Sequence, residues 1–160
     1  MSSFGETVVV AETGLGRYQV EARVANAAIL IDEPVASGGL GSGPNPYNLL
    51  GAALGACKTM TIRLYANRKS WPLTRVQVDV RHRRVDLNAR DVFEADVHLE
   101  GDLSAEQRER LLEIAERCPV HQTLTRGADV RTVLLPAKAA SGRPEEGPSH
   151  MNCMEEACID

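Results

Sequence analysis

The sequence predicts an α+β fold, because stretches with the two-residue period of a strand are interspersed with two stretches of helical period. The clearest strands are residues 76–85 and 93–99, where apolar side chains alternate with charged or polar ones. The loop 86–91 between them predicts an antiparallel pair. The helical stretches are residues 46–69 and 104–118.

Three short strands are expected before the first helix. A β-like run around Val8 and Val10 ends at a turn, 13–16, that contains two glycines. Residues 18–24 alternate between apolar and polar, and 27–31 form a third strand. Four glycines and two prolines within 37–46 then predict a loop.

The first helix begins at Asn45-Pro46, where Asn45 is a suitable N-cap and Pro46 occupies the first helical position. Apolar residues at helical spacing continue to about Lys69. Gly51 and Gly55 would each weaken this helix by about 1 kcal/mol relative to alanine. We therefore expect another element to pack very close to it.

The second helix begins at Ser104, which with Gln107 fits a capping box. Its apolar stripe runs through Leu111 to Cys118, and Pro119 is expected to end it. A last strand is predicted at 129–135. Residues 137–160 are rich in Gly, Pro, Ser and Glu, which predicts a mobile tail.

Composition excludes several classes of function. The chain has 160 residues, of which 43% are hydrophobic and 25% charged, as expected for one globular domain. Its formal net charge is −4 and its basic residues are scattered, which argues against nucleic acid or an anionic membrane as a partner. The first residues lack the pattern of a signal peptide, and no apolar run is long enough to span a bilayer, so we expect a cytoplasmic protein.

Four cysteines in such a protein are expected to be reactive or metal-binding rather than structural disulfides. Cys57 lies on the apolar side of the first helix, where a small buried hydrophobic residue and a reactive thiol are both possible. Cys118 is expected at the C-terminal end of a helix, where the dipole disfavours a thiolate, so it fits a resolving partner better than a nucleophile. The sequence alone does not show whether the two thiols touch.

Other candidate sites carry less weight. Cys118 and His121 have a Cys-x-x-His spacing, but no second matching pair lies in the folded part to complete a zinc site. His150, Cys153 and Cys158 form a looser cluster, and a metal site there is a minor hypothesis. His82 is expected to be buried or at an interface and His98 to be solvated. Arg17 follows a tight turn, where a side chain can point into a pocket.

These residues resemble the OsmC/Ohr family of thiol peroxidases, the osmotically induced and organic hydroperoxide resistance proteins. The resemblance runs from about Thr7 to Leu135 and is most specific in GPNPYNLLGAALGACKTMTIRLYANRKSWPL, in GDLSAEQRERLLEIAERCPVHQTL and in the DEP turn at 32–34. It implies an OsmC-like domain over residues 1–136, followed by the tail. It also implies antiparallel sheets wrapped around long central helices in an intertwined homodimer, with the active sites at the subunit interface.

The resemblance implies that Cys57 attacks an organic hydroperoxide and becomes a sulfenic acid, which Cys118 converts to a disulfide. A lipoyl-type or thioredoxin-type dithiol then reduces the disulfide as a co-substrate, and no cofactor or metal is expected. The apolar side chains of Leu49, Leu50 and Met60, with Trp71, are expected to line the substrate site.

In the organic hydroperoxide resistance branch an arginine holds the thiolate and is itself held by a glutamate upstream of the cysteine. Arg17 falls in the matching turn, but Tyr47 and Asn48 stand where the acid is expected. Either Asp32 or Glu33 holds Arg17 instead, or the thiol is activated less. The alternative function is therefore a small-molecule binding or redox-sensing protein of the same fold with little turnover.

Overall fold

The structure is a computed structural model that describes residues 7–137 and 151–158, without the side chains of 151–153. The chain separates into two compact units. The first contains the N-terminal residues up to Pro46 and the segment that starts at Asp129, and the second contains Tyr47–Ala128 and the last helix. The division follows the apolar core, because both clusters of buried apolar residues in the described chain lie in the second unit.

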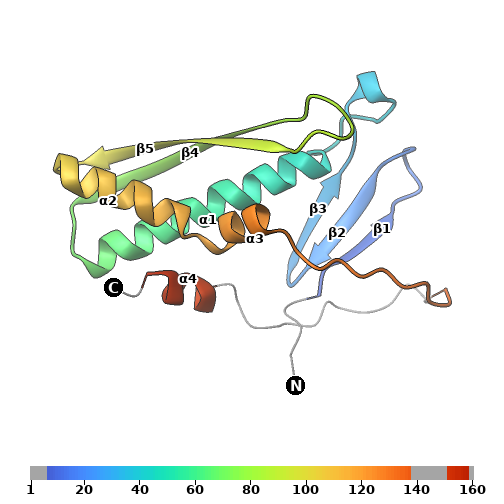
Figure 1. The fold of residues 1–160 in the computed structure, drawn as a ribbon. Coiled ribbons are helices and arrows are strands. Elements are labelled where there is room, and N and C mark those ends of the chain that lie inside the picture. The colour runs from blue at the N-terminus through green and yellow to red at the C-terminus, as the bar shows by residue number, and fades with distance from the viewer. Residues whose placement is uncertain (1–6, 138–150, 159–160) are drawn as a thin grey trace. The chain divides into compact units, whose positions relative to one another are not determined.

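The first unit is built on a three-stranded antiparallel sheet in the order β1-β2-β3 (Figure 1). Its strands are β1 (Val9–Glu12), β2 (Val20–Val24) and β3 (Ala27–Ile31), which confirms the three predicted strands. A short 3-10 helix, η1 (Val35–Ser37), lies in the glycine-rich loop that follows. The buried carboxylate of Asp32 organises this loop, because it accepts hydrogen bonds from the Ser42 hydroxyl and from the backbone N–H groups of Glu33, Leu40 and Ser42.

The strand predicted at 129–135 is wrong for the described chain. Residues 129–137 adopt no helix or strand, and no other described segment pairs with them. The apolar side chains that suggested a buried strand are exposed, and Leu134 is 98% exposed. A strand needs a neighbour that satisfies its backbone N–H and C=O groups, and that neighbour is missing from this part of the described chain.

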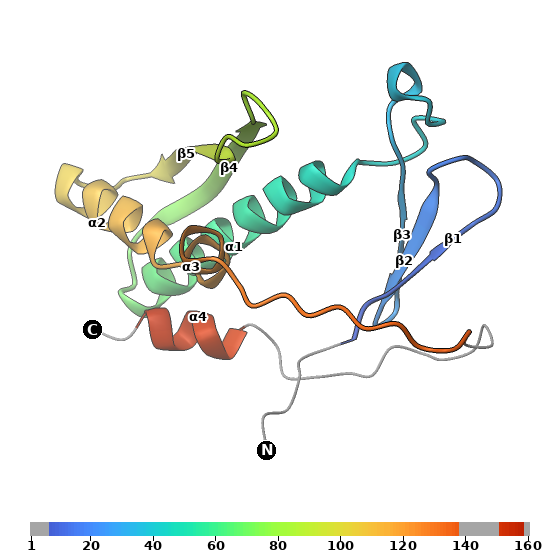
Figure 2. The ribbon, with the colours of Figure 1, turned by 45° about the vertical axis from the view of Figure 1, so that its right-hand side comes forward.

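The second unit is arranged around α1 (Pro46–Arg68), the predicted first helix. The hairpin of β4 (Leu73–Arg83) and β5 (Val92–Gly101) covers one side of α1, and α4 (Met151–Ala157) lies on the other (Figures 1 and 2). The two strands pair antiparallel with Val76 opposite Leu99 and Val80 opposite Ala95, as the alternation predicted.

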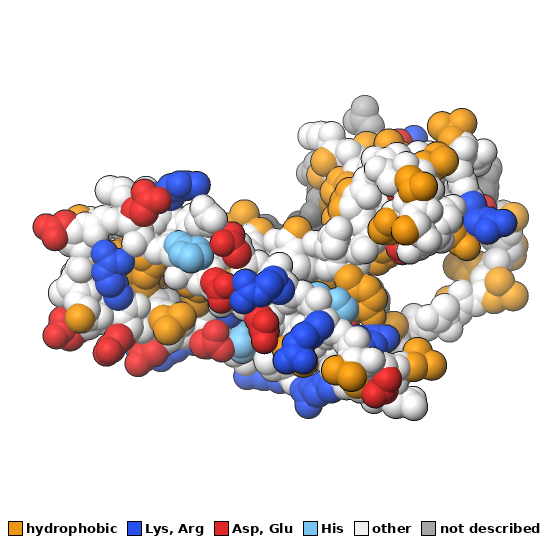
Figure 3. Space-filling model, turned by 90° about the horizontal axis from the view of Figure 1, so that it is seen from above, with side chains coloured by type: hydrophobic (Ala, Val, Ile, Leu, Met, Phe, Trp, Pro, Cys, Tyr) orange, Lys and Arg blue, Asp and Glu red, His pale blue; other side chains and the backbone are white. Residues whose placement is uncertain are grey.

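The outer face of the hairpin is densely charged (Figure 3). Cross-strand pairs lie on it, with Arg81 2.6 Å from Asp96 and His98 3.3 Å from Asp79. The inner face carries the valines that meet α1. The hairpin is therefore a polar cover over an apolar helix, and His98 is solvated as predicted.

The helix α2 (Ala105–Glu116) begins at the predicted capping box, in which the Ser104 side chain accepts from the N–H of Gln107 and the Gln107 side chain accepts from the N–H of Ser104. The second helix ends at Glu116, before Pro119, as predicted, but Pro119 has a further role that was not predicted. It is the first residue of a separate helix, α3 (Pro119–Arg126). A proline has no N–H to lose at that position, so it is as suitable for starting a helix as for stopping one.

The helix α4 differs from the mobile tail that was predicted for 137–160. The Met154 side chain is fully buried and Cys158, directly after the helix, is 5% exposed. The guanidinium of Arg68 donates to the Glu155 carbonyl at 3.3 Å. The composition of residues 137–160 did not predict this helix because few of them are apolar. Two buried side chains, Met154 and Cys158, are nevertheless enough to attach one short helix.

Two adjoining clusters make up the core. The larger contains the second half of α1, the start of β4 and the inner face of α2, with Ile62, Leu111 and Ile114 fully buried. The smaller contains Leu54, Cys57, Cys118 and Met154. None of the helices in the described residues combines the length and apolarity that crossing a bilayer requires.

Candidate active site: a buried cysteine pair

Cys57 is positioned by the inward stripe of α1. The buried residues of this helix recur at helical spacing, from Leu54 through Cys57 and Lys58 to Thr61 and Ile62. The Cys57 side chain is consequently almost inaccessible, with 2% of the residue exposed. The Thr61 hydroxyl donates to the Cys57 carbonyl at 2.7 Å, one turn along the helix.

Cys118 occupies a different position from the predicted one. It is the N-cap of α3, not the last residue of α2, and its sulfur accepts a hydrogen bond from the His121 N–H at 3.3 Å. Cys118 therefore faces the N-terminal, positive end of the α3 dipole, which favours a thiolate. The sequence had predicted a C-terminal helix end at Cys118, which would disfavour one. The thiol is fully buried.

The structure brings the two thiols together. Both are buried cysteines of the same apolar cluster that form no disulfide in the described residues, and the Cys57 side chain is a hydrogen-bond partner of the Cys118 thiol. This hydrogen bond, with burial second, raises the pKa of Cys118 well above its usual range. The His121 N–H and the charge of Lys58 oppose the shift but do not cancel it. The contact with Cys57 and burial thus both favour the protonated form of the Cys118 thiol.

A buried lysine that the sequence patterns did not single out lies beside this pair. The Lys58 side chain is only 3% exposed. Its Nζ lies 3.0 Å from the Ala115 carbonyl, 3.0 Å from Glu116 Oε1 and 3.1 Å from His121 Nδ1. The available signal was its place in the chain, since Lys58 falls four residues after Leu54 and four before Ile62, on the inward face of α1.

A cavity of about 420 Å³ adjoins the thiol cluster. Leu54, Phe93 and Leu124 line it and also pack in the cluster. Its polar wall includes Lys58 and His121. The cavity thus gives the cysteine pair an apolar neighbourhood with a charged border, a combination typical of small-molecule sites.

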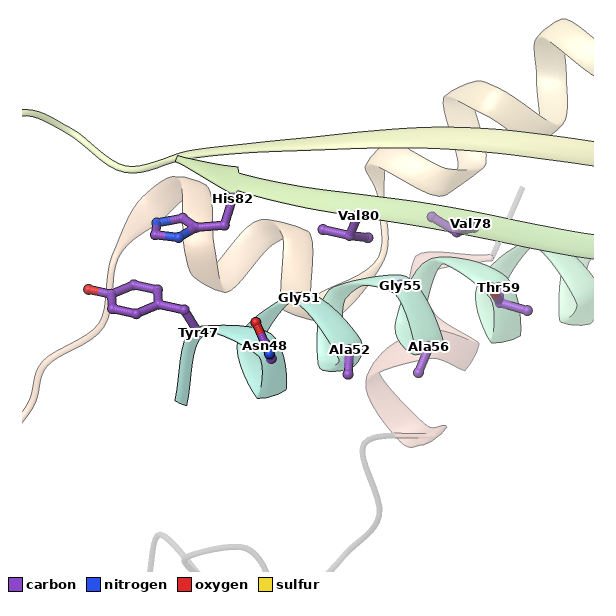
Figure 4. Close-up of a pocket in the computed structure, with 10 residues that line it drawn as sticks. All are labelled: Tyr47, Asn48, Gly51, Ala52, Gly55, Ala56, Thr59, Val78, Val80 and His82. Carbon is purple, nitrogen blue, oxygen red and sulfur yellow. The ribbon is translucent and has the colours of Figure 1, made fainter. Parts of the chain in front are cut away.

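A second cavity of about 400 Å³ lies between the first turns of α1 and the strand β4 (Figure 4). Tyr47 and His82 stack at its mouth with ring centroids 4.3 Å apart. Farther along, a β-carbon on Gly55 would lie 3.3 Å from Val80. The close neighbour expected from Gly51 and Gly55 is therefore β4.

Tyr47, which stands where an acid was expected, belongs to a network with Asp91. Arg84 donates to the Tyr47 hydroxyl at 2.6 Å and to both oxygens of Asp91. His82 Nε2 lies 2.7 Å from the same carboxylate. The hydrogen bond from Arg84, with that from His82 second, lowers the pKa of Asp91 to about 2. The half-buried His82 agrees with its predicted position.

The predicted substrate-site residues of α1 lie outside both cavities. Leu50 and Met60 remain almost half exposed, and neither they nor Leu49 lines either cavity. Trp71 packs on the larger cluster. Arg17 lies in the predicted turn in the first unit, 5.9 Å from the centre of the Tyr18 ring.

Neither acid proposed to hold Arg17 is seen to do so within the described residues. Asp32 is bound by its own loop, and no ion pair joins Arg17 to Glu33. That an acidic side chain holds Arg17 therefore stays a prediction.

The metal hypothesis for the tail stays untested. His150 lies outside the described residues, and so does the side chain of Cys153. Cys158 Sγ donates to the Thr61 carbonyl at 3.8 Å in the larger cluster. Elsewhere in the described residues, no three His, Cys, Asp or Glu side chains are grouped to hold a metal.

Comparison with known families finds one match. A family model described as OsmC-like protein matches residues 39–133, more than half of the chain. The matched region contains both cysteines and Lys58. A search of curated proteins finds no match.

Several solved structures are similar to this chain. An osmotic stress induced and detoxification response protein from Psychrobacter arcticus is 19% identical, with a TM-score of 0.66 over 77% of this chain and 89% of the other. The organic hydroperoxide resistance protein OsmC from Legionella pneumophila is 21% identical, with a TM-score of 0.61 over 78% and 91%. The organic hydroperoxide resistance protein OhrB of Bacillus subtilis is 21% identical, with a TM-score of 0.55 over 78% and 92%. At these identities the likeness establishes the fold and confirms the predicted α+β class.

Proposed function

The chain belongs to the OsmC-like family, and we propose that it is a thiol-dependent peroxidase that reduces organic hydroperoxides through Cys57 and Cys118. One observation carries the proposal: two cysteines from distant segments meet as hydrogen-bonded partners in one buried cluster. Relatives of the same fold that are named organic hydroperoxide resistance proteins support the substrate class.

In the first step the Cys57 thiolate attacks the terminal oxygen of the hydroperoxide. The O–O bond breaks, the oxygen transferred to sulfur gives a sulfenic acid, and the remaining alkoxide takes a proton and leaves as the alcohol. We assign the attack to Cys57 because its contact with Cys118, together with burial, raises the pKa of Cys118 and so makes Cys118 the poorer nucleophile.

In the second step the Cys118 sulfur attacks the sulfenic sulfur of Cys57. A disulfide forms, and the sulfenic oxygen leaves as water with the proton of Cys118. An external dithiol then reduces the disulfide by two exchanges and is itself oxidised. The apolar cavity beside the cluster would accept the organic part of the hydroperoxide, which favours such substrates over hydrogen peroxide.

The test is intact mass and thiol count after one equivalent of cumene hydroperoxide, with hydrogen peroxide in parallel. We expect the loss of two thiols and two hydrogens, a disulfide mapped to Cys57 and Cys118, and a faster reaction with the organic peroxide. In Cys118→Ser the reaction should stop at the sulfenic acid, and in Cys57→Ser no peroxide should be consumed. Peroxide consumption by Cys57→Ser would overturn the assignment.

A redox sensor with little turnover is the second candidate, and the Tyr47 network favours it. The position where an activating acid was expected carries a tyrosine that binds Arg84. Steady-state assays with a dithiol reductant separate the two functions, because a peroxidase consumes many equivalents of hydroperoxide and a sensor consumes about one.

We also propose that the protein is a homodimer. The segment 129–137 exposes Val130, Val133 and Leu134 without a strand partner in the described chain, and exposed apolar groups of this size are typical of interfaces. Light scattering at micromolar concentration should give the mass of two chains. Leu134→Asp should weaken the dimer, and Leu87→Asp, which changes an exposed loop leucine, should not. A monomeric wild type would contradict the proposal.

A further inference from the structure

Lys58 is a cation whose burial is unfavourable in free energy. It is enclosed by α1, the end of α2 and the start of α3, and it is only 3% exposed, whereas its partner Glu116 is 59% exposed. Desolvating an ammonium costs several kcal/mol, so a pair of this kind contributes little net stability. A charge kept in such a place beside two thiols is better explained by an effect on those thiols.

The contacts of Lys58 bracket Cys118 in the chain. Ala115 and Glu116 precede this cysteine and His121 follows it, and all three lie about 3 Å from Lys58 Nζ. The same residue, His121, donates its backbone N–H to Cys118 Sγ. The ammonium and the N-terminus of α3 therefore present positive charge to the same sulfur.

The hydrogen bonds also define the state of the His121 ring. A lysine has only donors, so Nδ1 of His121 must accept from it, and the ring proton must be on Nε2. Nε2 lies 3.2 Å from Glu116 Oε2, to which it can donate. Burial, and next the charge of Lys58, lower the pKa of His121, which keeps the ring neutral at neutral pH. Lys58 is thus the cation of this group.

Other charges around Lys58 are less well placed to act on the thiols. Glu116 is largely in water, so its negative charge offsets the charge of Lys58 only in part. Arg90 and Asp91, from the loop before β5, also line the cavity, and Asp91 is already paired with Arg84. From α4 the group that enters the thiol cluster is the uncharged Met154.

We propose that Lys58 is the positioning cation of the cysteine pair: its ammonium stabilises the state in which Cys57 and Cys118 share one proton and one negative charge. The inference rests on the proposed function and names the group that supplies the charge there. The two thiols titrate as a unit, so Lys58 acts on the first ionisation of the pair. In this role Lys58 acts through the two thiols.

The test is the pH dependence of alkylation of the reduced protein by iodoacetamide, with Cys57 and Cys118 followed by peptide mapping. Lys58→Met should move the midpoint of the profile upward by about one pH unit, the size expected for losing a nearby charge. Lys58→Arg should recover most of this shift. Arg63→Met is the matched control, because Arg63 is a cation of the same helix that binds the Leu73 carbonyl instead, and its profile should stay at the wild-type midpoint.

Glu116→Gln gives a prediction of opposite sign. It removes the charge that neutralises Lys58 at a largely exposed position, so the midpoint should move downward and the fold should be retained. If Lys58→Met fails to fold, Glu116→Gln still tests whether the charge of Lys58 sets the midpoint of the alkylation profile. A folded Lys58→Met with the wild-type midpoint, or an upward shift in Glu116→Gln, would overturn the role of Lys58.

The proposed function is judged separately. Alkylation requires no hydroperoxide, so the role of Lys58 can be tested even in a protein that reduces none. If the wild type leaves cumene hydroperoxide intact, the peroxidase proposal fails, while the shift in Lys58→Met still reports on the charge at the thiols.

Discussion

The attachment of α4 to the thiol cluster can be tested by replacing Met154. Its side chain is fully buried against Leu54, Cys57 and Cys118. A helix of seven residues is not stable alone, so α4 depends on this contact and on Cys158. Removing Met154 therefore weakens the attachment of the whole helix.

The magnitude follows from the burial. Replacing a fully buried methionine by alanine costs about 2 to 5 kcal/mol, and the lower value applies here because a short helix can detach and so limit the loss. A loss of about 2 kcal/mol corresponds to roughly thirtyfold more frequent exposure of the cluster, since about 1.4 kcal/mol is a factor of ten.

The assay is the rate at which N-ethylmaleimide modifies Cys57 and Cys118 under native conditions, compared between wild type and Met154→Ala. We expect roughly thirtyfold faster modification in the variant at an excess of reagent. Glu155→Ala is the control, since this exposed side chain lies on the same helix and its backbone bond to Arg68 would remain. Equal rates in wild type and Met154→Ala would refute the argument that α4 covers the thiols.

Four further outcomes are expected. Ser104→Ala should lower the free energy of unfolding by about 1 kcal/mol in urea titrations, because the capping box of α2 is lost; an unchanged value would contradict this. Gly51→Ala should stabilise the protein by about 1 kcal/mol through helix propensity, since its new β-carbon meets Val80 at an ordinary 3.6 Å. Gly55→Ala should gain less, because its β-carbon would lie 3.3 Å from Val80, and an equal gain would mean that Val80 moves aside. The last outcome concerns His121, whose pKa in the folded protein lies below its ordinary 6.5. The unfolded chain therefore binds the proton more readily, and the stability that the neutral ring contributes is lost as the pH falls below about 6.5. His121→Gln should lose less stability than wild type between pH 7.5 and 5.5, roughly the range in which an unfolded histidine titrates, and equal losses in the two proteins would contradict this.

Local sequence was sufficient for most of the regular elements. The alternation in β4 and β5 predicts one buried face whatever the rest of the chain does, because successive side chains of a strand point to opposite sides. The Ser104 capping box likewise depends on residues three apart. In such features the interacting atoms belong to residues that are close in the chain, so the sequence pattern is sufficient to predict the contact.

The candidate site needed tertiary structure. The sequence placed Cys57 and Cys118 on apolar faces, but their hydrogen bond depends on how α1 packs against the junction of α2 and α3. The same junction decides that Cys118 caps α3, which reverses the effect of the helix dipole on its sulfur.

What the sequence by itself determined is the α+β class, the elements with strong local patterns and the two cysteines as candidates. Only the tertiary structure decided that Lys58 is buried beside them, that Met154 covers them, and that the apolar residues of 129–135 find no strand partner in the described chain. The physical reason is the same in each case. Burial and pairing are properties of the neighbours that a side chain acquires on folding, and those neighbours come from distant parts of the chain.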